Sequence, residues 1–191
     1  KSGEALAHYR EALRIDPQFA GAHFHLANAL ADLGTLDIAL GHYTETLRLR
    51  PDFSEAHFNM ANVLARRQKP DLALQHYQET LRLDPAHPGA HYNLANLLAE
   101  RGDDTGAIRH YEETLRLRPG DADARNNLGV ALARQQRLAD AEAQYREAIR
   151  LAPSFARPYY NFGNLLAEHR ECAGAAKHLE RAAELQPGWW Q

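Results

Sequence analysis

Histidine is the side chain of this 191-residue protein with the widest chemical range, and eleven histidines are present. Four of them, His42, His76, His110 and His178, are separated by multiples of 34 residues. Packed helices lie roughly 8 to 10 Å apart, whereas every ligand of a zinc ion must reach within about 2.1 Å of the metal. One histidine per 34-residue unit is too sparse for that, so we interpret these residues as repeated surface histidines and predict no metal site.

No other pattern indicates catalysis. The single cysteine, Cys172, rules out an internal disulfide framework, and we expect no nucleophilic role for it. A glycine-rich phosphate loop does not occur in the sequence. We therefore predict a protein that is not an enzyme and that holds no cofactor.

Side-chain amides form a second set of regularly spaced residues. One column holds Asn28, Asn62, Asn96 and Asn164, with Val130 interrupting it, and a neighbouring column holds Asn59, Asn93, Asn127 and Asn161. Aromatic residues accompany them at Phe24, Phe58, Tyr92 and Tyr160. An amide both donates and accepts hydrogen bonds, so a row of amides can hold an extended peptide without reading its sequence.

Magnitudes restrict this peptide-binding hypothesis. Four amide contacts at about 1 kcal/mol each supply about 4 kcal/mol, which corresponds to a millimolar affinity. Burial of ligand side chains against the aromatic column would have to add to it. In the alternative interpretation the asparagines only brace adjacent repeats, and we favour bracing for the Asn59 column and ligand contact for the Asn28 column.

A fixed period underlies both sets. Successive members of one proline series lie 34 residues apart: Pro17, Pro51, Pro85, Pro119, Pro153 and Pro187. Alanines and tyrosines run in step with it, for example Ala39 with Ala73 and Tyr43 with Tyr77. A constant period of this length is typical of a repeat architecture.

Each period contains the pattern of two helices. In the first full period, apolar spacing predicts one helix over 21–33, with Leu26, Leu30 and Leu33 on its buried stripe and Gly34 ending it. A second helix is predicted over 36–49, ended by the nearby Pro51. The short connection makes the two helices antiparallel. Such a hairpin needs neighbours to stack on, and small residues recur where helices would approach closely: Ala27, Ala61, Ala95, Gly129 and Gly163.

These columns resemble the tetratricopeptide repeat. In the first full period the family pattern is matched by Leu26-Ala27, Leu30, Ala39, Tyr43 and Pro51, and it recurs through four more periods. The family's opening tryptophan is replaced by His23, His57, His91, Arg125 and Tyr159. The resemblance implies an all-α fold, an α-solenoid in which antiparallel helix-turn-helix units form a right-handed superhelix whose first helices line a concave groove.

The repeats divide the chain into a single predicted array over residues 1–191. Residues 1–19 match only a second helix; five full repeats follow at 20–53, 54–87, 88–121, 122–155 and 156–189; and 190–191 begin a further helix. We interpret the chain as part of a longer protein, in which Trp189 packs at the start of the next helix. Self-stacking of the uncapped ends is a further expectation, which light scattering over a range of concentrations would test.

One stretch narrows the resemblance. The run from Ala22 to Asn28, echoed at 56–62 and 90–96, is similar to the repeats that precede the catalytic domain of O-linked N-acetylglucosamine transferases. In that family an asparagine ladder holds extended protein substrates. Our main prediction is a scaffold that binds a peptide or protein partner, and the alternative is the substrate-presenting arm of such a transferase.

Charge and composition argue against other partners. The net charge is only -3, and the charges expected near the groove are mixed in sign: Asp32, Glu55, Arg66, Glu100, Asp123, Arg134, Arg157 and Glu168. We therefore predict neither nucleic-acid binding nor a lysine-rich clamp for a terminal carboxylate. No apolar run reaches membrane-spanning length. A reducing compartment fits the single cysteine, and we expect a cytoplasmic protein.

Overall fold

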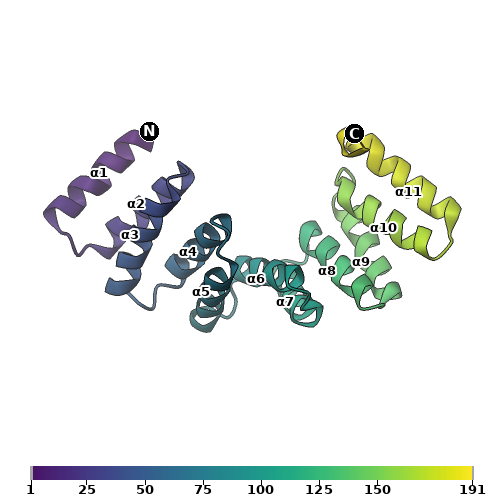
Figure 1. Ribbon diagram of the computed structural model, residues 1–191, viewed down its shortest axis with the longest axis horizontal. Helices are drawn as coiled ribbons and strands as arrows, with labels where there is room; N and C mark the ends of the chain where they lie inside the picture. The colour runs from purple at the N-terminus through teal and green to yellow at the C-terminus, as the bar shows by residue number, and fades with distance from the viewer. Residues whose placement is uncertain (1, 191) are drawn as a thin grey trace. The chain divides into compact units, whose positions relative to one another are not determined.

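The computed structural model describes residues 2–190 and the side chains of residues 4–188, and its regular elements there are all helical (Figure 1). In order they are α1 (Ser2–Ile15), α2 (Ala20–Asp32), α3 (Leu36–Leu49), α4 (Ser54–Arg66), α5 (Pro70–Leu83), α6 (Pro88–Glu100), α7 (Asp104–Leu117), α8 (Ala122–Arg134), α9 (Leu138–Leu151), α10 (Ala156–Glu168), α11 (Cys172–Leu185) and the 3-10 turn η1 (Pro187–Trp190). The predicted all-α fold is confirmed. Our interpretation of Trp189 and of residues 190–191 lies outside the described side chains.

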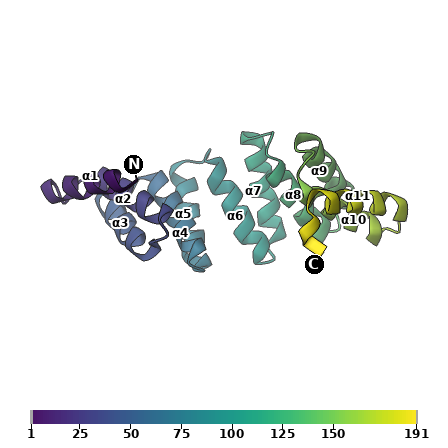
Figure 2. The same cartoon turned by 90° about the horizontal axis from the view of Figure 1, so that it is seen from above.

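Paired antiparallel helices are the building unit, as Figure 2 shows for α10 and α11. First helices begin at Ala20, Ser54, Pro88, Ala122 and Ala156, each 34 residues after the last. The predicted second helix over 36–49 is confirmed as α3. We number the full repeats from first to fifth in chain order, so that α6 and α7 form the third repeat and α8 and α9 the fourth.

One predicted core position is wrong. Leu33 lies just beyond the end of α2 and is 56% exposed, whereas Leu26 and Leu30 are buried. The helix stops there because Gly34 has a φ of 78°, in the left-handed region. Gln68, Gly102, Gln136 and Arg170 occupy the same turn of the later repeats, also with positive φ. The turn geometry is thus constant although the residue type is not.

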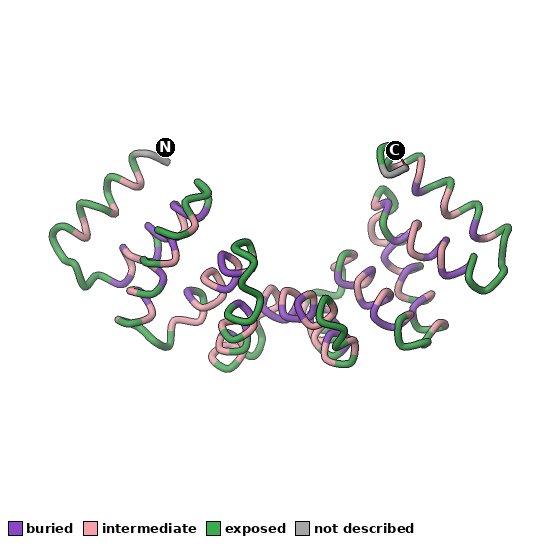
Figure 3. Tube along the Cα trace, in the orientation of Figure 1, coloured by how far each residue is buried: buried purple, intermediate pink, exposed green. Residues whose placement is uncertain are grey.

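The chain forms two compact units, residues 1–90 and 91–191. In the first unit α2 packs on α3 and α4 on α5, while α1 contacts α2 and α3 contacts α4. In the second unit α8 pairs with α9 and α10 with α11, and α7–α8 and α9–α10 contacts join successive pairs. Each unit has its own apolar cluster. Figure 3 shows the buried positions along the sides of helices that face a neighbour.

Small residues allow the close approach of paired helices, as the sequence predicts. Ala27, Ala61 and Ala95 are completely buried. At the equivalent Gly129, an added Cβ would lie 2.5 Å from a ring carbon of Tyr145. The second helix of the fourth repeat therefore holds its tyrosine against bare backbone.

Crossing a bilayer would require a long and strongly apolar helix, and none of the helices in the described part of the chain qualifies.

Candidate functional site

Tyrosine hydroxyls orient the asparagine column. A tyrosine on each second helix donates to the side-chain oxygen of an asparagine on its paired first helix: Tyr43 to Asn28 at 2.5 Å, Tyr77 to Asn62 at 2.6 Å and Tyr111 to Asn96 at 2.6 Å. The tyrosine side chains are buried, and burial raises the pKa of the Tyr43 and Tyr111 hydroxyls, which keeps them protonated as donors. The Oδ1 atoms of these asparagines are thus engaged within the protein.

The second amide column braces successive first helices. Asn59 Nδ2 on α4 donates to Asn28 Oδ1 on α2 at 3.1 Å, and Asn127 Nδ2 on α8 donates to Asn96 Oδ1 on α6 at 3.1 Å. Asn161 on α10 donates instead to the buried Asn126 on α8, at 2.8 Å. These three contacts are those of the bracing interpretation. They also leave each ladder asparagine with its Nδ2 group as the part that a ligand can reach.

The amide donor of Asn28 shows this most clearly. No other described residue accepts a hydrogen bond from its Nδ2, while its Oδ1 accepts two. Asn28 also lines an open hollow between α2 and α4, together with Tyr43, Asn59 and Arg66. With its oxygen held from inside the protein, the Asn28 amide has a fixed orientation. It can offer N–H groups to a carbonyl oxygen of a ligand.

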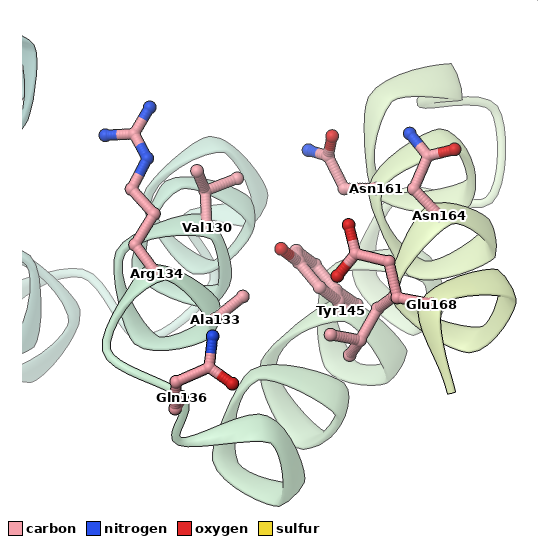
Figure 4. Close-up of a pocket in the computed structure, with 9 residues that line it drawn as sticks. Val130, Ala133, Arg134, Gln136, Tyr145, Asn161, Asn164 and Glu168 are labelled. Atoms are coloured by element: carbon pink, nitrogen blue, oxygen red, sulfur yellow. The ribbon is translucent and has the colours of Figure 1, made fainter.

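Two further hollows lie along the first helices of the second unit. One, between α6 and α8, is lined by Tyr92, Asn96, Asn127 and Arg157 among others. The other, between α8 and α10, is lined by Val130, Tyr145, Asn164 and Glu168 among others (Figure 4). The three volumes are about 390, 340 and 300 Å³, at the lower end of the range for ligand pockets. Each is suited to a few ligand side chains or a stretch of backbone, not to an enclosed small molecule.

Arginines partly close the alanine side of these hollows. Arg66 Nη1 donates to the carbonyl of Ala31 at 3.1 Å, and Arg134 Nη1 donates to that of Ala99 at 3.2 Å. Both carbonyls lie near the C-terminal end of a first helix, where a cation is favoured by the helix dipole. These guanidinium groups are therefore engaged by the protein, and they form no strongly basic surface for an anionic ligand.

The aromatic column is less uniform than its sequence indicates. Phe24 is only 7% exposed, and its ring packs 4.6 Å from that of Phe53, so it offers little surface to a ligand. Phe58 is partly buried with its ring 4.4 Å from that of His87. Tyr92 accepts from Asn127 at 3.2 Å at the wall of its hollow. Tyr160 is partly buried on α10. Phe58, Tyr92 and Tyr160 thus keep some exposed surface.

Histidines are paired within repeats, which corrects our interpretation of them as sparse surface residues. His23 and His42 face each other with their Nδ1 atoms 2.9 Å apart, and His57 with His76 and His91 with His110 repeat that distance. We had considered the His42 column alone, whereas the family's tryptophan column supplies the partner. The pairing still makes no metal site of three ligands, since the described residues contain no such group.

The tryptophan column has a common structural role. His23 Nε2 lies 3.1 Å from the Pro17 carbonyl, and His57 Nε2 lies 3.1 Å from that of Pro51. In the fourth repeat Arg125 donates to the Pro119 carbonyl at 3.0 Å and to Gln144 at 3.1 Å. Three residue types can fill this column, because Tyr159 also donates to the Pro153 carbonyl. What the column requires is a donor that reaches the preceding loop.

Sequence reasoning missed the tyrosine hydroxyls as part of the site. It placed Tyr43, Tyr77 and Tyr111 only in the core, yet a buried hydroxyl normally finds a partner. The signal was available, since a column that needs only an apolar ring could equally hold phenylalanine. Fifteen residues separate each tyrosine from its asparagine, a distance that only the hairpin closes.

Comparisons with known families agree with this geometry. Tetratricopeptide repeat models match residues 1–34, 52–120 and 92–154. The chain is built of tetratricopeptide repeats. No curated protein matches it. These matches identify the repeat but do not extend to glycosyltransferases, so the transferase-arm interpretation stays a prediction.

Solved tetratricopeptide structures share the fold at low sequence identity. YrrB, whose structure is described as a tetratricopeptide protein with an unusual peptide-binding site, is 23% identical, with a TM-score of 0.85 over 95% of this chain and 94% of its own. MamA from Desulfovibrio magneticus RS-1 is 22% identical, with a TM-score of 0.83 over 90% of this chain and 97% of its own. Cut9, in a complex with Hcn1, is 21% identical with a TM-score of 0.77; the match covers 98% of this chain but 37% of that one. At these identities the likeness establishes the fold alone.

Proposed function

We propose that this repeat scaffold binds an extended segment of a partner protein along its first helices, with the asparagine Nδ2 groups donating to backbone carbonyls of the bound segment. The observation that carries the proposal is the engagement of Asn28 Oδ1 by Tyr43 and Asn59, which leaves the amide donor as the ligand-facing group. An extended backbone presents carbonyls whatever its sequence. The scaffold would therefore select its partner mainly through side chains that enter the hollows.

Two further observations support a peptide over other ligands. The hollows are open and lined by both polar and apolar groups, as Asn96 and Val130 show in one of them. Arg66 and Arg134 are engaged with backbone carbonyls, so no surplus of free positive charge favours nucleic acid. The similarity in fold to YrrB, a protein described as having a peptide-binding site, is consistent with this use of the repeat.

Replacement of asparagine by aspartate tests the proposal more sharply than replacement by alanine. Asn28→Asp keeps an oxygen for Tyr43 and Asn59 but removes the amide donor, and Asn96→Asp does the same beside Tyr111. Alanine would instead remove the partner of a buried hydroxyl and confuse binding with stability. We expect peptides selected from a displayed library by the intact chain to bind the double aspartate variant at least about tenfold more weakly.

The matched control is Gln75→Glu, which makes the same amide-to-acid change on an exposed position of α5. Its binding should equal that of the unaltered chain. Fluorescence polarisation with the selected peptides measures affinity, and thermal unfolding checks that the variants stay folded. If the double aspartate variant binds as tightly as the Gln75→Glu control, the amide ladder does not hold the ligand.

A further inference from the structure

The hollow of the fourth repeat contains a tyrosine whose hydroxyl has lost its internal acceptor. Tyr145 on α9 corresponds to Tyr43, Tyr77 and Tyr111, each of which donates to an asparagine. Val130 stands where that asparagine would be. Tyr145 is only 2% exposed, and its hydroxyl makes no hydrogen bond with any residue in the described part of the chain.

That hydroxyl faces the hollow between α8 and α10. Figure 4 shows the Tyr145 ring between the two helices, with its oxygen directed into the gap and the Glu168 carboxylate beside it. Burial raises the pKa of the Tyr145 hydroxyl, so the group stays a donor at neutral pH. A buried donor without a partner is a costly feature that a ligand acceptor would relieve.

The remaining walls restrict the chemistry of that acceptor. Val130, Ala133 and Leu165 supply an apolar side. Glu168 is exposed and forms no ion pair with another described residue. Arg134 points away, towards α6, where its Nη1 donates to the Ala99 carbonyl. The hollow therefore combines one neutral donor with one free carboxylate, separated from bulk solvent on one side by methyl groups.

We propose that this hollow is a subsite for a neutral primary carboxamide, the side chain of a glutamine or asparagine carried by the bound peptide. The carboxamide oxygen would accept from Tyr145, and its NH2 group would donate to Glu168. An anionic side chain would face Glu168 without a cation to balance it. A cationic side chain would satisfy Glu168 but leave the Tyr145 donor unpaired. The subsite rests on the proposed function, because it assigns one side chain of the extended ligand.

A single blocked amino acid tests the subsite without requiring the rest of the peptide. The probe is N-acetyl-glutamine methylamide, followed by backbone amide shifts in NMR, with the blocked glutamate, lysine and methionine compounds as comparisons. We expect weak binding of the glutamine probe at millimolar concentration, with shifts at Val130, Asn161 and Asn164. The other three probes should bind several-fold more weakly.

Two variants complete the test. Tyr145→Phe removes an unpaired hydroxyl, so the fold should persist while the glutamine probe binds about fivefold more weakly. Val130→Asn restores the tyrosine–asparagine pair of the other repeats and should close the subsite by a similar factor without loss of stability. Equal binding of the glutamine probe to both variants and to the unaltered chain would overturn the assignment, as would preferred binding of the lysine probe. Failure of the Asn28 and Asn96 test would refute the ladder while leaving this result unaffected.

Discussion

The third and fourth repeats have the same helices and the same buried tyrosine, but they treat polar groups differently. In the third, Tyr111 donates to Asn96 and His91 faces His110. In the fourth, Tyr145 has no asparagine, and Arg125 with Gln144 replaces the histidine pair. The core of the repeat thus tolerates exchange of its polar partners. What changes with them is the titration behaviour of the repeat and the donors available to a ligand.

The largest expected difference is in pH dependence. Two imidazoles whose Nδ1 atoms are 2.9 Å apart can share one proton, but a second proton places two N–H groups against each other. Burial, followed by the charge of His91 and then of Arg109, lowers the pKa of His110 to about 4, while Asp103 and Glu113 oppose this. The Arg125–Gln144 pair does not titrate in this range.

The sign of the effect follows from proton uptake. Between about pH 6.5 and about pH 4 the unfolded chain binds the His110 proton and the folded chain does not, so stability is complete above this window and falls as the pH is lowered through it. We expect the double change His91→Arg with His110→Gln to remove about 2 kcal/mol of this loss, allowing for screening of a half-buried group. Urea unfolding at pH 7.5 and pH 4.5 measures it. An unaltered pH dependence in the double variant would contradict the prediction.

The second difference concerns how closely the tyrosine approaches its paired helix. Gly129→Ala places a methyl group 2.5 Å from the Tyr145 ring, which must shift. We expect overpacking to cost more than the helix propensity of alanine returns, for a net loss of about 1 to 2 kcal/mol in the free energy of unfolding. Thermal unfolding of Gly129→Ala measures this, with Gly41→Ala as control, since an added Cβ at Gly41 meets nothing within 4 Å. A gain in stability equal to that of the control would show that the ring moves at little cost.

The smallest expected effect separates the two tyrosines themselves. Tyr111→Phe leaves Asn96 Oδ1 without its buried donor and should lower the free energy of unfolding by about 1 kcal/mol. Tyr145→Phe removes a hydroxyl that donates to no described residue and should cost nothing measurable. Chemical unfolding of the two variants side by side gives the comparison. Similar losses in both would mean that Tyr145 has an acceptor after all, and the subsite inferred from it would fail.

Much of the fold could be predicted because the period was written in residues that act locally. Pro51 and Gly34 mark helix ends, and Ala39 and Tyr43 recur at the period of the buried face, so α3 was placed with its observed bounds. Leu33 was assigned to the core because apolar spacing cannot show where a helix stops. A left-handed residue at the turn decides that point, and glutamine or arginine can occupy it as well as glycine.

The site could be predicted only in part. The columns of Asn28 and Asn59 were visible as candidates, but nothing in their spacing shows that Asn59 donates to the same oxygen as Tyr43. The histidine pairs escaped for a related reason, since His23 and His42 lie nineteen residues apart and meet only across the hairpin. Contacts between columns depend on the rotation of each helix, which the period leaves free.

The sequence alone determined that this protein is a stack of helical hairpins, because helix spacing, breakers and small residues repeat in register over nearly the whole chain. Tertiary structure decided which atom of each amide is left for a ligand. It did so through hydrogen bonds between residues on different helices, whose geometry is set by packing. The same packing left Tyr145 with a donor facing an open hollow, a consequence of Val130 that no single column of the sequence shows.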